Sequence, residues 1–380
     1  MVIYSSSITS IGFPLMDKEQ GEKRDFLPDF FEKLRDFNVK IYLEKSYGAK
    51  LGYTEKDYIR ANKNIYFVER ETVFKQNIII VIRAPELHFI DLMQPNSGLI
   101  SMLHYDTRPQ LLSKLKKKNI HGFSLDSIVD DRNQRLVVSY ELTAYGGVQA
   151  AFTQLRKKII NKQLIKGKPL KVSILGMGNL GFQAAKYSFK EFNQQKFEMY
   201  GVEGISVEFL EKEITKFQNS LEKILNETDL LIDSTKRVDS TQVIIPNQWL
   251  GYLPSNSVIL DLTADPYKLN GKQIQQKAIE GIPHGNIDKY VFTADDPAWE
   301  KDIPKEIESI NRRETISCNA WPSVTARECM ELYGEKIWPF LKVLLKKGFQ
   351  LNVDSENHDE RAIAKSTVEY FENTIVQKIE

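Results

Sequence analysis

Residues 170–181 read Leu-Lys-Val-Ser-Ile-Leu-Gly-Met-Gly-Asn-Leu-Gly, and this stretch decides the fold. Its first half is a short, largely apolar run typical of a buried strand, and the residues after it have helical spacing. Three glycines lie between them. The first permits a tight turn, the second lets backbone amides approach a pyrophosphate, and the third lets helix and strand pack closely. The pattern predicts a Rossmann unit for a nicotinamide dinucleotide. The residues expected to bind it are Gly176, Gly178, Asn179, Leu180 and Gly181.

A Rossmann unit also needs a carboxylate at the end of its next strand, roughly 20 residues further on, to bind the adenosine ribose. Glu198 and Glu203 lie near that distance, but the pattern around them is not that of a strand. Residues 205–210 form a better strand, and Glu211 follows it directly. We therefore expect Glu211 to bind the ribose. A carboxylate there favours NAD over NADP because it repels a 2′-phosphate, although NADP stays open.

The rest of the chain alternates apolar runs with helical patterns, as βαβ units do. Residues 78–82 are five consecutive isoleucines and valines, which suits a strand buried on both faces of a parallel sheet. At 380 residues the chain is long enough for two domains. The predicted fold class is α/β, with two Rossmann-like doubly wound domains. A nucleotide-binding domain, 141–324, is inserted in a discontinuous substrate domain made of 1–140 and 325–380.

Composition bounds the partners of the chain. A net charge of +1 gives no electrostatic case for binding nucleic acid, and no apolar run approaches the roughly 20 residues that span a bilayer. Two cysteines are too few for a disulfide framework or a zinc cluster, and no other set of metal ligands is visible. The N-terminus has no signal-peptide pattern. We therefore expect a cytoplasmic protein without metal, membrane or nucleic-acid partners.

Several motifs occur in a familiar order along the chain. They are Ile11-Gly12-Phe13-Pro14, Arg24 with Leu27-Pro28, Arg83-Ala84-Pro85, Met102-Leu103-His104, the segment 256–265, and the segment 322–327. Together they resemble the alanine dehydrogenase and pyridine nucleotide transhydrogenase family, whose relatives include saccharopine dehydrogenase and N-(carboxyethyl)ornithine synthase. The resemblance covers about residues 11–345. It implies an NAD(P)-dependent oxidoreductase acting on amino acids.

The resemblance implies roles for four side chains. Arg24 and Arg83 would anchor the substrate carboxylate, because a guanidinium pairs with both oxygens at once. His104 would accept a proton from the amine or from water, since imidazole titrates near neutral pH. Asp265, just beyond a parallel strand, would orient substrate and water. Asp261 is the alternative acid at that edge.

The chain departs from the family pattern in three places. Arg83 stands where the family has a lysine, and Pro266-Tyr267 stand where alanine dehydrogenases have a glycine pair. Asn319 corresponds to a cofactor-binding asparagine but lies one residue further from Pro322 than in the family. These differences make the redox class a firmer expectation than alanine as the substrate.

The sequence therefore predicts an NAD(H)-dependent amino-acid dehydrogenase, resembling alanine dehydrogenase, that interconverts a small L-amino acid with its 2-oxo acid and ammonia. A second hypothesis is a saccharopine- or opine-type dehydrogenase, which reductively condenses a 2-oxo acid with an amino acid. A third is a catalytically silent nucleotide-sensing module. The expected partners are a small-molecule amino acid and a 2-oxo acid, and the resemblance leaves monomers and homo-oligomers open.

Overall fold

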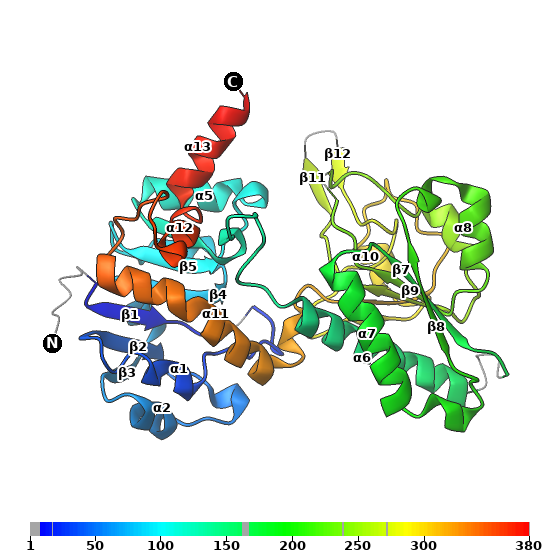
Figure 1. Ribbon diagram of the computed structural model, residues 1–380, viewed down its shortest axis with the longest axis horizontal. Coiled ribbons are helices and arrows are strands. Elements are labelled where there is room, and N and C mark those ends of the chain that lie inside the picture. Colours follow the sequence, from blue (N-terminus) through cyan, green and yellow to red (C-terminus); the bar gives the residue numbers. More distant parts are fainter. Residues whose placement is uncertain (1–7, 17, 162–166, 238, 271–272, 380) are drawn as a thin grey trace. The chain divides into compact units, whose positions relative to one another are not determined.

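The computed structural model describes residues 8–16, 18–161, 167–237, 239–270 and 273–379. The chain divides into two compact units (Figure 1). Unit 1 comprises Met1–Lys18, Glu22–Val138 and Ala326–Glu380, and unit 2 comprises Glu19–Gly21 and Ser139–Thr325. The chain of unit 2 is thus inserted in that of unit 1. Residues 19–21 also belong to unit 2, so the chain leaves unit 1 there for three residues and then returns to it. The sequence pattern did not predict this short excursion.

Unit 1 is built on a six-stranded parallel sheet in the order β3-β2-β1-β4-β5-β6. Its strands are β1 (Ser10–Phe13), β2 (Lys40–Glu44), β3 (Ile65–Val68), β4 (Ile78–Arg83), β5 (Gly98–Met102) and β6 (His121–Ser124). Its helices are α1 (Pro28–Glu32), α2 (Glu55–Ala61), α3 (Arg70–Val73), α4 (Leu87–Ile90), α5 (Pro109–Lys117), α11 (Ala326–Lys347), α12 (His358–Ala364) and α13 (Val368–Ile379).

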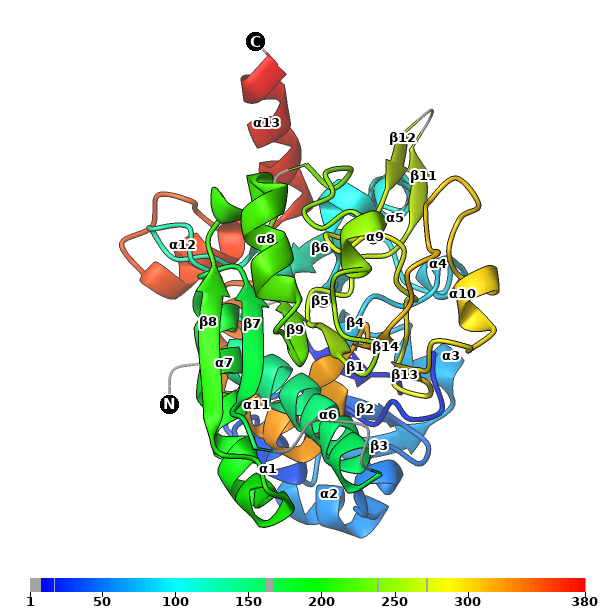
Figure 2. The same cartoon turned by 90° about the vertical axis from the view of Figure 1, so that its right-hand side faces the viewer.

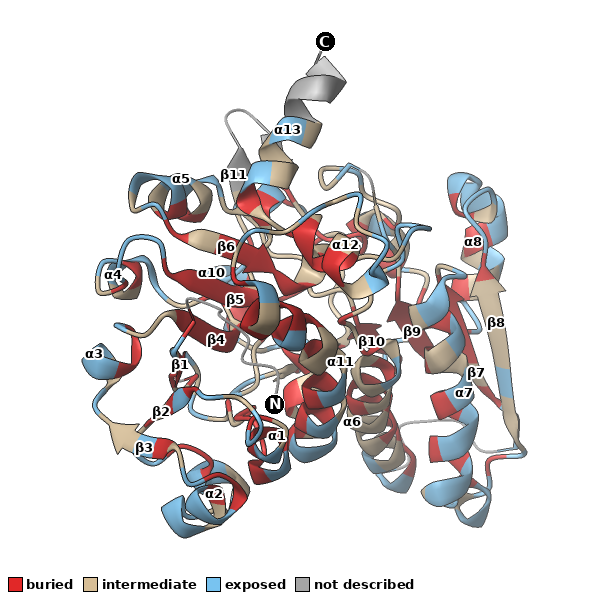
Figure 3. Cartoon of the chain, turned by 60° about the vertical axis from the view of Figure 1, so that its left-hand side comes forward, coloured by how far each residue is buried: buried red, intermediate tan, exposed pale blue. Residues whose placement is uncertain are grey.

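The middle of this sheet is buried on both faces. All five apolar residues of β4, 78–82, are buried, as the continuous apolar run predicted. Figure 3 shows β4 and β5 as buried strands, while the outer surfaces of the helices around them are exposed. The strand order reverses at β1, between β2 and β4, which is where doubly wound sheets bind ligands beyond the carboxyl ends of their strands.

Unit 2 has a second six-stranded sheet in the order β13-β14-β10-β9-β7-β8, parallel except for β13. Its strands are β7 (Leu170–Leu175), β8 (Ile205–Leu210), β9 (Leu230–Asp233), β10 (Val258–Asp261), β13 (Val291–Phe292) and β14 (Glu314–Ser317), beside a hairpin of β11 (Lys268–Asn270) and β12 (Gln273–Gln275). Its helices are α6 (Tyr140–Ile160), α7 (Asn179–Gln194), α8 (Gln218–Leu225), α9 (Asn247–Leu250) and α10 (Ala298–Lys301).

Helices cover both faces of this sheet (Figure 2). Alternate strand residues, such as Leu230 and Ile232, pack in one core with α6 and α7. Leu231, between them, packs in the other core with α8 and α9. Both sheets are therefore doubly wound and Rossmann-like, and the predicted fold class is confirmed. Among the described residues, no helix has the length and apolar content needed to cross a membrane.

Candidate active site

The predicted phosphate turn joins β7 to α7 in unit 2. Gly176 has a φ of 93°, which only glycine adopts without strain. A Cβ on Gly181 would lie 2.3 Å from the carbonyl oxygen of Gly176, so the helix and the turn could not approach so closely with any larger residue. Gly178 precedes α7 without a side-chain cap, and a Cβ there would meet nothing within 4 Å. The space beside Gly178, at the N-terminus of α7, is therefore open, as an anion site requires.

A cavity of about 710 Å³ opens in front of this turn. Gly176 and Gly178 line it, together with Glu211 beyond β8 and the segment 234–237 beyond β9. The carboxyl ends of three parallel strands thus contribute to one pocket, which has the size expected for a cofactor site. The glycine turn and the predicted ribose ligand meet in this cavity, which fits a dinucleotide.

Glu211 is exposed beside lysines at the far end of the cavity. Its Oε2 accepts a hydrogen bond from the backbone N–H of Glu213 at 2.9 Å. Lys212 and Lys216 line the same cavity, and Lys216 forms an ion pair with Glu213 at 2.7 Å. This end of the pocket therefore has charges of both signs, so that Glu211 alone does not set the preference between NAD and NADP.

The remaining predicted cofactor residues lie off this cavity wall. Asn179 and Leu180 are the first residues of α7, and the exposed Asn319 donates its backbone N–H to Gly285 at 3.0 Å. None of the three lines the cavity. Their roles stay predictions.

Asp265 is held by an arginine that the sequence analysis did not identify. The Asp265 carboxylate is 2.6 Å from Nη2 of Arg237, whose side chain is only 4% exposed. Arg237 also donates to the carbonyls of Gln242 and Gln276, each at 2.6 Å. Because Arg237 lines the dinucleotide cavity, this ion pair connects Asp265 to the predicted cofactor site within unit 2.

A fully buried ion pair supports the turn that carries Asp265. Asp261, at the end of β10, lies 2.6 Å from Lys277, and both side chains are completely buried. The other Asp261 oxygen accepts the backbone N–H groups of Thr263 and Ala264, at 3.0 and 2.7 Å. This fixes Ala264 at a φ of 51°, in the left-handed region. Asp261 is therefore a structural group, and Asp265 is the accessible acid at this edge.

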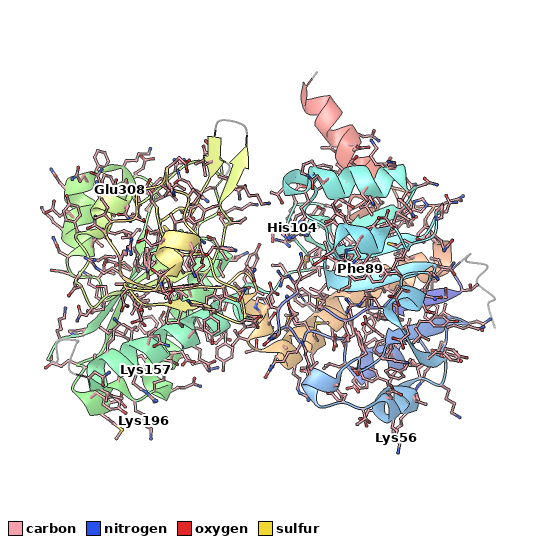
Figure 4. All side chains as sticks on the ribbon, turned by 180° about the vertical axis from the view of Figure 1, so that it is seen from behind. Lys56, Phe89, His104, Lys157, Lys196 and Glu308 are labelled. Atoms are coloured by element: carbon pink, nitrogen blue, oxygen red, sulfur yellow. The ribbon has the colours of Figure 1, made fainter. Side chains whose placement is uncertain are left out.

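His104 follows β5 in unit 1 and is labelled in Figure 4. Its side chain is 43% exposed, and its Nδ1 lies 3.3 Å from Oδ2 of Asp126. Burial by itself raises the pKa of Asp126, but hydrogen bonds from His104 and Ser124 outweigh it and lower the pKa to about 2. An ionised Asp126 therefore holds Nδ1 and leaves Nε2 for a ligand. Asp126 was not found from the sequence.

Arg24 and Arg83 meet on one carboxylate. Arg24, 6% exposed, donates from Nε and Nη2 to the two oxygens of buried Glu22, at 2.9 and 2.6 Å. Arg83, at the end of β4, lies 3.6 Å from the same group. Burial of Glu22 raises its pKa, but the Arg24 hydrogen bonds and both positive charges together lower it to about 2. A substrate carboxylate would share these arginines with Glu22, another group that the sequence did not reveal.

Comparisons with known proteins show what the chain is similar to. Residues 16–142 match the family model described as alanine dehydrogenase/PNT, N-terminal domain. An alanine dehydrogenase of Methanococcus maripaludis is 26% identical over 183 residues, which are 46% of this chain and 49% of that protein; the match therefore spans about half the length of that relative. An N(5)-(carboxyethyl)ornithine synthase of Clostridium botulinum is 24% identical over 302 residues, 77% of this chain and 84% of that protein.

A solved L-alanine dehydrogenase shares the fold, with a TM-score of 0.70 and 17% identity over 94% of each chain. The resemblance that the sequence motifs indicated is confirmed as a similarity: residues 16–142 match the N-terminal-domain model of the alanine dehydrogenase/PNT family, and part of the chain is similar in sequence to an alanine dehydrogenase.

Proposed function

We propose that this chain is an NAD(H)-dependent amino-acid dehydrogenase that interconverts an L-amino acid with its 2-oxo acid and ammonia. The observation that carries the proposal is the oriented His104–Asp126 pair in unit 1, at the carboxyl ends of the strands that also present Arg83. A histidine with one nitrogen held by an ionised carboxylate is prepared to move a proton at the other. The similarity to an alanine dehydrogenase and a carboxyethylornithine synthase supports the redox class.

The dinucleotide would be held in unit 2. Backbone amides at Gly178 and the N-terminus of α7 would bind its pyrophosphate, and Glu211 would bind a ribose. When bound, the nicotinamide supplies or accepts the hydride. Asp265, held by Arg237, would orient polar groups of the substrate.

The amino acid would be held in unit 1. Arg83 and Arg24 would bind the 2-oxo acid carboxylate, and Nε2 of His104 would give a proton to the departing oxygen of the substrate during reductive amination. In sum, a 2-oxo acid, ammonium, NADH and a proton give the L-amino acid, NAD⁺ and water. In the oxidative direction His104 would take the proton back from water that adds to the imine.

A second candidate replaces ammonia by the amine of another amino acid, as in opine-type enzymes. The match to carboxyethylornithine synthase over 77% of this chain supports this opine-type reaction as the second candidate. It uses the same carboxylate anchor and the same base, so only the nitrogen donor differs.

The test is oxidation of NADH, followed by absorbance, with a panel of 2-oxo acids, each with ammonium and then with lysine, ornithine or glutamate. Turnover with ammonium supports the dehydrogenase. Turnover only with a second amino acid would contradict the ammonia-dependent dehydrogenase and support the opine-type reaction instead. Saturable NADH binding without turnover on any pair would overturn both and leave a silent nucleotide-sensing module.

A further inference from the structure

Two more arginines converge on the proposed substrate site of unit 1, and both contact Met102. Met102 ends β5 and is the register partner of Arg83 on β4. Nη1 of Arg108 donates to the carbonyl oxygen of Met102 at 3.3 Å, and Nη2 of Arg135 lies 3.8 Å from its sulfur. Two guanidinium groups therefore contact the residue that lies two positions before His104, and the strand pairing places Arg83 beside that residue.

The contacts that the protein gives Arg108 and Arg135 are weak. A carbonyl at 3.3 Å and a thioether at 3.8 Å are long hydrogen bonds for groups with five donors each. Among the described residues, neither guanidinium has a carboxylate within 4 Å, and the Nε of Arg135 is buried without any hydrogen-bond partner. An unpartnered buried donor costs free energy unless a ligand satisfies it.

The acids nearby are already engaged. Both carboxylate oxygens of Glu22 accept hydrogen bonds from Arg24. The Asp126 carboxylate accepts a hydrogen bond from Ser124 and lies beside His104. Burial lowers the pKa of Arg108, and the charge of Arg83 lowers it further, against the opposing effect of Asp126. Positive charge therefore accumulates around Met102 beyond what one substrate carboxylate would neutralise.

We infer that Arg108 and Arg135 form a second carboxylate subsite, so that the substrate is a dicarboxylic 2-oxo acid, with its reacting end on Arg83 and Arg24. The inference rests on the proposed function for the identity of the ligand. A planar guanidinium fork matches a carboxylate better than a lysine does, and leaving such a fork unpaired disfavours a 2-oxo acid with an apolar side chain.

The first test compares 2-oxoglutarate and oxaloacetate with 2-oxobutyrate in the NADH assay, in the wild type and in Arg135→Met and Arg108→Met. The wild type should prefer a dicarboxylic substrate at least tenfold in kcat/KM. Each variant should raise KM for that substrate about 10- to 100-fold, the loss expected for one charge-assisted pair, and change kcat/KM for 2-oxobutyrate less than threefold. The matched control is Arg132→Met, which removes the same charge from an exposed side chain three residues away.

Equal use of mono- and dicarboxylic substrates, or a preference that survives in the double variant Arg108→Met/Arg135→Met, would overturn the subsite while leaving the dehydrogenase intact. If no 2-oxo acid turns over, the proposed function fails and calorimetric titration of the full chain with glutarate decides the subsite separately. Saturable glutarate binding that weakens at least tenfold in Arg135→Met but not in Arg132→Met supports it. No binding, or phosphate binding as tightly as glutarate, refutes it.

Discussion

At the scale of single residues, the proposed chemistry depends most on His104. His104→Ala should lower kcat at least about 100-fold, since general acid–base catalysis contributes 10²–10⁴. The Kd for NADH should stay within about twofold, because the phosphate turn belongs to unit 2. Steady-state kinetics and NADH fluorescence titration measure the two quantities. His88→Ala, a change at an exposed histidine of unit 1, is the control, and turnover surviving without His104 would remove it from the mechanism.

A second residue-scale prediction concerns a buried acid. Burial raises the pKa of Asp25 to about 7 and the charge of Glu22 adds to this, against a hydrogen bond from the Gly48 N–H. Because the folded chain disfavours the ionised form, unfolding becomes easier as pH rises from about 4 through 7. Asp25→Asn should therefore gain roughly 1–4 kcal/mol over the wild type at pH 8, and less than half of that gain at pH 5.

Urea unfolding at both pH values measures this difference. Asp29→Asn, at an exposed position in α1, is the control and should show the same small effect at each pH. An Asp25→Asn advantage that does not change with pH would mean that Asp25 is not protonated in the folded chain.

The sequence predicted several site residues but not the side chains that contact them. His104, Arg83 and Asp265 were identified because the family resemblance implies their roles, and each lies at or just beyond the carboxyl end of a strand. Their partners Asp126, Glu22 and Arg237 were not. Asp126 lies 22 residues from His104, beyond β6, and Arg237 lies 28 residues from Asp265, so only the parallel pairing of strands brings them together. No local pattern in the sequence records such contacts.

At the scale of elements, two glycines of the β7–α7 turn have different expected roles: Gly178 in NADH binding alone, and Gly181 also in the packing of the helix against the turn. Gly178→Ala adds a methyl group to open space, at a φ of −83° that alanine adopts, so stability should be unchanged. The methyl group would occupy the face where the pyrophosphate is expected, and the Kd for NADH should rise at least tenfold. Gly181→Ala should weaken binding too, and in addition destabilise unit 2 by about 1–3 kcal/mol through contact with Gly176.

Thermal unfolding and fluorescence titration of both variants measure these effects. The two glycines serve as each other's controls, because only one of them touches the helix–strand packing. NADH binding to Gly178→Ala with wild-type affinity would show that the cofactor does not approach this turn.

Elements were predicted more reliably than side-chain partners, because apolar periodicity follows burial directly. A strand at residues 205–210 leaves a longer connection after α7 than a strand near Glu198 would, and in the structure this connection contains a 3₁₀ turn at Phe197–Tyr200. The crossing at 19–21 was not predictable, since it depends on two backbone N–H groups, of Gln20 and Gly21, that bind Asp288 far along the chain at 2.9 and 2.6 Å.

At the scale of the whole molecule, the proposal divides the two ligands between the two units. The predicted domain ranges, 1–140 with 325–380 and 141–324, lie close to the units of the structure, whose crossings fall at 138/139 and 325/326. The assignment of substrate to the first and NAD to the second is still a proposal. The sequence could predict domain ranges because strands, turns and helices have local sequence patterns. Which unit binds which ligand depends on contacts between residues far apart in the chain, which local patterns do not reveal.

Hydrogen–deuterium exchange of the full chain tests that division. NADH at 100 times its Kd stabilises the bound state by about 2.7 kcal/mol, so amides that exchange only when the site opens should slow about 100-fold. The slowing should fall on 176–182 and 234–237 in unit 2, whereas a dicarboxylate such as glutarate should protect 102–108 in unit 1. The Gly178→Ala variant should lose the protection by NADH in unit 2, and the Arg135→Met variant should lose the protection by glutarate in unit 1. NADH protection confined to 102–108 would reverse the assignment, because the cofactor would then bind the unit without the glycine turn.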